Sequence, residues 1–173
     1  MLRILIDPHG GGGDVGMMAL DGRKESEMTF RIAAMLQDKY LDQTILLTRS
    51  LTSEVSLYDR FKIIQNDRPH LTLSLHLEPN ADQTNRYGVG VYYFFKDAEA
   101  GSLGRIMSTE FQKNMRFHKV RSYPSNFYLV RKSKNVFVIR LPYLLKISSE
   151  KVDTEIDRFC DAMGSVFKRI ECK

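Results

Sequence analysis

The sequence predicts a single layered α/β domain over residues 1–173, with a mostly parallel mixed sheet of about six strands and helices on both faces. Two observations predict this fold. Short apolar runs rich in β-branched residues alternate with longer segments whose apolar residues recur at helical spacing. Strands that alternate with helices favour parallel pairing, in a sheet covered on both faces. No internal repeat, low-complexity tract or linker-like run divides the sequence.

The predicted strands begin almost at the first residue. Residues 2–6 form an apolar run that ends at Asp-Pro and leads into a glycine-rich loop at 9–16. The run at 88–95 is rich in Val, Tyr and Phe, which favour strands. The other predicted strands are residues 44–48, 71–76, 127–131 and 136–141.

The predicted helices carry apolar stripes at helical spacing. One spans residues 25–40, and a second closes near Asn66. Ser102 is the expected N-cap of a third helix, and a fourth closes the chain. The stripe of this last helix is Val152, Ile156, Phe159, Met163, Val166, Phe167 and Ile170. Ligands of such sheets bind beyond the carboxyl ends of the strands, so the loops after Asp7, His76 and Leu141 are the expected functional region.

Composition excludes few function classes. The chain is 43% hydrophobic and 27% charged, and no apolar run approaches the roughly 20 residues of a membrane span. The net charge of +5 is spread along the chain, so nucleic-acid binding rests on charge alone and is not expected. The opening residues show no signal segment, which predicts a cytoplasmic protein unless a signal was removed or phage-type export applies.

Three potential metal ligands fall at or near the predicted strand ends. His9 follows the first strand, Glu25 opens the first helix and His76 ends the third strand. Two imidazoles and a carboxylate form a catalytic zinc set that leaves the fourth tetrahedral position open. By residue type alone, hydrogen-bonded structural histidines and a glutamate that complements the helix dipole are more common than a metal site.

Five segments in chain order resemble one enzyme family. The first reads Asp-Pro-His-Gly-Gly-Gly-Gly-Asp-Val-Gly at 7–16, and the second begins Glu-Ser-Glu-Met at 25–28. The third is Leu-Thr-Arg at 47–49 with Leu57, Arg60 and Asn66, and the fourth is Leu-Ser-Leu-His-Leu-Glu-Pro-Asn at 73–80. The fifth is Gly-Val-Gly-Val-Tyr-Tyr at 88–93. Together they resemble the zinc-dependent N-acetylmuramoyl-L-alanine amidases.

This resemblance implies a peptidoglycan hydrolase. Zinc held by His9, Glu25 and His76 would activate water against the amide between muramic acid and L-alanine. The resemblance also assigns supporting roles to three other residues. Asp14 is expected to hydrogen-bond the loop backbone, whereas Arg49 and Arg60 are expected to brace the fold. The remaining histidines, His70 and His118, match nothing in the family pattern and are expected at the surface.

The sequence departs from the family pattern at two places. The family reads Pro-Gly-His where this chain reads Pro-His-Gly, so His9 stands one residue early unless the glycine-rich loop takes another path. The family also ends its last core strand with a glutamate that acts in proton transfer, and Arg140 occupies that position here. Arginine cannot act as a base, since its pKa exceeds about 12.

These departures leave two functions open. In the first, the chain is an amidase in which Glu78, close after His76, acts as the base. In the second, it is an inactive amidase-fold module that binds peptidoglycan or a protein. Arg140 would then pair with Glu25 or Glu78 and replace the metal with its own positive charge. A surface-exposed loop carboxylate remains the simplest explanation of Glu78.

Overall fold

The computed structural model describes residues 1–115 and 119–172, and His118 lies outside them. Its six strands form one sheet in the order β2-β1-β3-β6-β4-β5. The strands are β1 (Arg3–Pro8), β2 (Thr44–Leu47), β3 (Leu71–His76), β4 (Val89–Phe94), β5 (Val120–Ser125) and β6 (Val136–Arg140). The helices are α1 (Glu25–Lys39), α2 (Leu57–Asp67), α3 (Ala98–Asn114), α4 (Tyr128–Lys132) and α5 (Ser149–Glu171), with short 3-10 turns η1 (Gln83–Asn85) and η2 (Pro142–Leu145).

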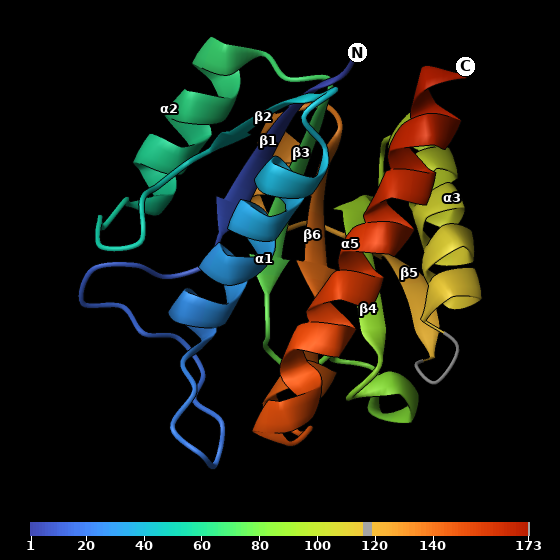
Figure 1. The fold of residues 1–173 in the computed structure, drawn as a ribbon. Helices are drawn as coiled ribbons and strands as arrows, with labels where there is room; N and C mark the ends of the chain where they lie inside the picture. The colour runs from blue at the N-terminus through green and yellow to red at the C-terminus, as the bar shows by residue number, and fades with distance from the viewer. Residues whose placement is uncertain (116–118, 173) are drawn as a thin grey trace.

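The strand directions bring four carboxyl ends, those of β1, β2, β3 and β6, to one end of the sheet. β1 pairs in parallel with β2 and β3, and β3 pairs in parallel with β6. β4 runs antiparallel to β6 and parallel to β5, which makes the sheet mixed but mostly parallel, as predicted. The carboxyl ends of β1, β3 and β6 therefore lie side by side, at the lower end of the sheet in Figure 1.

Alternation of side chains along the strands supplies two apolar faces. On one face, Ile4, Leu73 and Phe137 belong to the core cluster that α1, α3 and α5 complete. On the other face, Leu5 and Val138 belong to a smaller cluster that includes residues of α2 and α4. Helices thus cover both faces, as the sequence predicts. No helix among the described residues is long and apolar enough to cross a membrane.

Two element predictions are wrong, although the number of strands is right. Residues 127–131 were expected to form a strand, but Tyr128–Lys132 is the short helix α4. The missing strand is β5, which lies at the sheet edge and pairs only with β4. The third helix begins at Ala98 rather than after Ser102, because the Asp97 carboxylate accepts a 2.9 Å hydrogen bond from the Ala100 N–H.

Candidate metal centre

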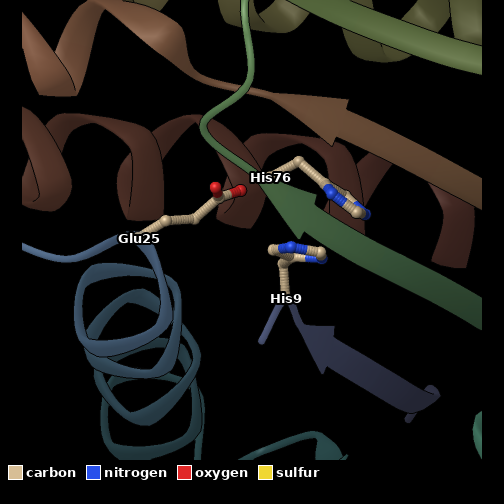
Figure 2. Close-up of side chains that lie close together, drawn as sticks. All are labelled: His9, Glu25 and His76. Atoms are coloured by element: carbon tan, nitrogen blue, oxygen red, sulfur yellow. The ribbon is translucent and has the colours of Figure 1, made fainter. Parts of the chain in front are cut away.

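His9, Glu25 and His76 converge at the carboxyl edge of the sheet. Each offers one potential ligand atom, and these atoms all lie within 4.8 Å of one another. Figure 2 shows His9 just beyond the arrowhead of β1, His76 at the end of β3 and the Glu25 side chain reaching in from the start of α1. The two imidazole rings lie 4.5 Å apart, centroid to centroid. We call these three side chains the His/Glu group.

Glu25 is completely buried, and two backbone N–H groups hold its carboxylate. Oε2 accepts from the Met17 N–H at 2.8 Å, and Oε1 accepts from the Leu77 N–H at 2.7 Å. A buried carboxylate is costly to desolvate unless hydrogen bonds or a cation compensate for the lost water. Among the described residues, no arginine or lysine forms an ion pair with Glu25. A cation bound at the His/Glu group would therefore compensate the charge of this buried carboxylate.

A chain of hydrogen bonds fixes the ring of His76. The Ser74 hydroxyl donates to Asp7 Oδ2 at 2.7 Å, and Ser74 Oγ lies 3.1 Å from His76 Nε2. Because the single hydroxyl hydrogen is committed to Asp7, Ser74 Oγ must accept the Nε2–H of His76. The other ring nitrogen, Nδ1, then carries the free lone pair.

His76 Nδ1 is suited to a metal. It is buried and has no hydrogen-bond partner within the described residues. Burial lowers the pKa of His76 well below 6.5, and the nearby His9, Arg140 and Arg60 lower it further, so the imidazole is neutral at pH 7. A neutral imidazole is the form that binds a metal. An orphaned imidazole nitrogen, a second imidazole and a buried carboxylate fit the donor set that zinc prefers.

The position of His9 is fixed by two buried arginines. Arg49 Nη2 donates to the His9 carbonyl at 2.8 Å, and its Nε donates to the Pro8 carbonyl at 2.9 Å. Arg60 donates to the Gly10 carbonyl at 2.7 Å and forms an ion pair with Asp7. These contacts confirm both arginines as braces, and they hold the loop in a path that brings His9 into the group despite its early position in the sequence.

The glycine-rich loop needs glycine at Gly16, beside Glu25. Gly16 has φ +64°, and a Cβ there would lie 2.7 Å from Glu25 Oε2. Asp14 shapes the same turn, since its Oδ1 accepts from the Gly16 N–H at 3.0 Å, as the sequence predicts. The loop can therefore approach the carboxylate only without a side chain at this position.

Arg140 pairs with Glu78 and not with Glu25. Its Nη2 donates to Glu78 Oε2 at 2.8 Å, and its Nη1 donates to the Pro79 carbonyl at 3.0 Å. The guanidinium also lies over two aromatic rings, 5.1 Å from the centroid of Tyr92 and 5.3 Å from that of Phe127. Of the two partners predicted for Arg140, Glu25 or Glu78, the described contacts give Glu78.

A cleft opens beside the two histidines on the side of α2. We call it the polar cleft; its volume is about 360 Å³, and His9, His76 and Arg60 line it together with Glu54 and Asp14. Asp14 Oδ2 lies 3.9 Å from His9 Nε2. Glu78 is not among the described residues that line this cleft, and it does not belong to the His/Glu group.

The sequence reasoning missed the support that Asp7 and Ser74 give to His76. A signal for it existed, because Ser74 and His76 are two residues apart on one strand and so share a face of the sheet. The pairing register places Asp7 opposite Ser74 on the neighbouring strand. That register is a property of the sheet and cannot be read from one strand alone.

An α/β domain with a His/Glu/His group at the carboxyl edge of its sheet is a candidate metal-dependent enzyme. The family model described as N-acetylmuramoyl-L-alanine amidase matches residues 4–150, and the chain belongs to this family. The amidase CwlM of Bacillus licheniformis is 28% identical over 137 residues, which cover 77% of this chain and 53% of that protein. The chain thus spans about half the length of this relative.

Solved structures share the fold at low sequence identity. The catalytic domain of the amidase CwlV from Bacillus (Paenibacillus) polymyxa var. colistinus superimposes with a TM-score of 0.80 at 15% identity. The superposition covers 100% of each chain. The CwlD amidase of Clostridioides difficile, solved in complex with the GerS lipoprotein, gives a TM-score of 0.77 at 17% identity, covering 98% of each chain. These likenesses confirm the single-domain layered fold.

Proposed function

We propose that the chain hydrolyses the amide between N-acetylmuramic acid and the first L-alanine of the peptidoglycan stem, with zinc as cofactor. The observation that carries the proposal is the convergence of His9, Glu25 and His76 within 4.8 Å. Membership of the amidase family supplies the reaction and the substrate. Because peptidoglycan lies outside the cytoplasmic membrane, the proposal implies that the chain is exported or released on lysis.

His9, Glu25 and His76 would hold the metal. Bound there, zinc supplies Lewis acidity, which polarises the amide carbonyl and makes water a stronger nucleophile. The chain's own residues keep the ligands in place: Ser74 orients His76, and Arg49 holds the loop that carries His9.

Proton transfer is assigned to Glu78, the candidate base identified in the sequence. The family's glutamate is replaced by Arg140, whose guanidinium cannot accept a proton at neutral pH. Glu78 is the carboxylate that Arg140 binds, at 2.8 Å, so an acid group still lies next to the family position. The side chain of Glu78 is 42% exposed, which leaves it accessible to water.

The first experiment measures metal content and cleavage together. Zinc-loaded protein is dialysed, its zinc is measured by elemental analysis, and release of stem peptides from purified peptidoglycan is followed. We expect about one zinc per chain in the wild type and none in His76→Ala. The matched control is His70→Ala, which removes an exposed imidazole whose Nδ1 accepts from the Arg3 N–H at 2.8 Å, away from the group.

The outcomes separate the two functions that the sequence leaves open. Cleavage that requires zinc and falls about 10²–10⁴-fold in Glu78→Gln supports the amidase with this base. If the wild type binds zinc but does not cleave peptidoglycan, and Arg140→Glu does not restore cleavage, the chain would instead be assigned a binding or regulatory role. Absence of zinc after loading would refute the proposed metal centre.

A further inference from the structure

A second groove lies beside the His/Glu group, distinct from the polar cleft. Its volume is about 200 Å³. One wall is the loop at 17–20, with exposed Met17, Met18 and Leu20, and the other is η2, with Leu145 at its end. Arg86, Tyr87 and Lys146 also line it. We call this feature the cationic groove.

Hydrogen bonds join the two walls of the cationic groove. Arg23 Nη1 donates to the Leu144 carbonyl at 2.9 Å, and its Nη2 donates to the Ile147 carbonyl at 2.6 Å. Asp21 holds the Arg23 guanidinium through its Nε, which lies 2.8 Å from both carboxylate oxygens. The loop is thus fixed against η2, and the groove between them is a built feature of the fold.

Two cations in this groove have no carboxylate partner among the described residues. Arg86 Nη1 donates to the Gln83 amide oxygen, at 3.4 Å, and its Cζ lies 5.8 Å from the ring centroid of Tyr87. Lys146 Nζ lies 4.8 Å from the centroid of the same ring. The hydrogen bond from Arg86 and the charge of Lys146 lower the pKa of Tyr87. Positive charge therefore gathers around one tyrosine.

The cationic groove adjoins the His/Glu group at Met17. Met17 lines the groove, and its backbone N–H donates to Glu25 Oε2 at 2.8 Å. Pro79 also lines it and lies close after His76 in the chain. The polar cleft contains the same two histidines but is lined by the carboxylates Asp14 and Glu54. The described lining of the polar cleft thus mixes carboxylates with Arg60, whereas the charged side chains in the described lining of the cationic groove are the cations Arg86 and Lys146.

The two arms of the substrate also differ in charge. The scissile amide uses the nitrogen of L-alanine, so the stem peptide runs away from it in the N-to-C direction and ends in a carboxylate. The arm on the acyl side is a sugar, which is rich in hydroxyl groups and carries no charge at this point. Complementary charge orients a ligand and disfavours the reversed orientation.

We propose that the cationic groove binds the peptide arm of the substrate, with Arg86 and Lys146 recognising a peptide carboxylate and Met17 and Leu145 contacting its aliphatic side chains. The glycan arm then lies in the polar cleft. This assignment rests on the proposed amidase function, and it makes Arg86 and Lys146 determinants of specificity.

The test crosses two protein variants with two ligands. The ligands are a muramoyl-tripeptide with a free C-terminal carboxylate and the same molecule with a C-terminal carboxamide. The groove variant is Arg86→Gln/Lys146→Gln, and the control is Lys132→Gln/Lys134→Gln. The control removes equal charge from exposed positions just before the amino end of β6, whereas the His/Glu group lies at the carboxyl ends of the strands. Both kcat/KM and the dissociation constant from calorimetric titration are measured.

We expect the wild type to favour the carboxylate form about tenfold, the size of two exposed ion pairs, and the groove variant alone to lose this preference. Equal use of both ligands by the wild type, or an equal loss on both in the groove variant, would overturn the assignment. If no variant cleaves either ligand but the calorimetric preference behaves as expected, the groove assignment stands and the amidase proposal fails.

Discussion

Replacing Ser74 by alanine tests whether the buried network prepares His76 for a metal. The Ser74 hydroxyl links Asp7 to the His76 ring, at 2.7 Å and 3.1 Å respectively. Without it, the ring loses the acceptor that fixes its Nε2–H tautomer. Asp7 Oδ2 also loses its donor, whereas Oδ1 keeps its bonds from Thr48 and Arg60. The substitution therefore removes both bonds of the Ser74 hydroxyl and leaves the remaining bonds of the network in place.

The structure sets the expected magnitude. Loss of an outer hydrogen bond to a metal ligand typically lowers metal affinity about 10- to 100-fold, and we expect Ser74→Ala to lower zinc affinity by this amount. Ser74 is fully buried, so leaving Nε2–H without a partner should also destabilise the metal-free protein by about 1–3 kcal/mol. Both effects follow from the missing hydroxyl.

The assay is zinc affinity by competition with a chelating indicator, accompanied by ¹⁵N NMR of the His76 ring in the metal-free protein. The wild type should show the Nε2–H tautomer, and Ser74→Ala should show a mixture. Thr72→Val is the matched control, because Thr72 is equally buried on the same strand and its hydroxyl has no hydrogen-bond partner in the described residues. Affinity within threefold of wild type in Ser74→Ala, or an equal loss in Thr72→Val, would refute the reasoning.

Gly16→Ala should abolish zinc retention and lower the free energy of unfolding by about 1–2 kcal/mol, because φ is +64° and the new Cβ would lie 2.7 Å from Glu25 Oε2; elemental analysis and urea unfolding measure the two effects. Arg140→Met should lower the free energy of unfolding by about 1–3 kcal/mol, since it removes the ion pair with Glu78 and the bond to a backbone carbonyl. Asp82→Asn should make thermal unfolding less sensitive to acid: the pKa of Asp82 is lowered from 3.8 to about 2, so its stabilising effect is present above about pH 4 and is lost as the pH falls toward 2.

Each of these predictions has a control in the chain. Gly22 has φ +86°, and a Cβ added there would meet no atom of the described residues within 4 Å, so Gly22→Ala should share the backbone strain but keep its zinc. Arg105→Met removes an exposed arginine whose Nη2 donates to a serine hydroxyl at 3.0 Å, and should change stability little. For Asp82, the chief cause of the lowered pKa is the Thr84 hydroxyl, so Thr84→Val should reproduce part of the altered acid response. An unchanged acid response in Asp82→Asn would contradict the assignment.

The sequence by itself determined the class of fold and the chemical types of the candidate ligands. Buried runs such as residues 136–140 are largely apolar, as a strand covered on both faces must be, and their order along the chain predicts the layers. The family segments place His9, Glu25 and His76 at strand and helix ends. Because strand ends of a parallel sheet meet at one edge, these residues could be expected to converge.

Tertiary structure decided the elements whose local signal is weak. β5 has largely polar residues and a proline, and only its pairing with β4 makes it a strand. Residues 127–131 are apolar enough for a strand, but their packing beside β4 and β6 makes a helix of Tyr128–Lys132. Short apolar runs have no periodicity that distinguishes the two structures.

The state of the site was likewise decided in three dimensions. Nothing in the local sequence indicates that Arg140 binds Glu78 rather than Glu25, because its neighbours Tyr92 and Phe127 come from separate segments of the chain. The early position of His9 is accommodated by Arg49 and Arg60, which are distant in sequence and reach the loop through its carbonyl groups. Residue type fixes what a side chain can bind, but its hydrogen-bond partners are set by packing between elements, and only the folded chain contains that information.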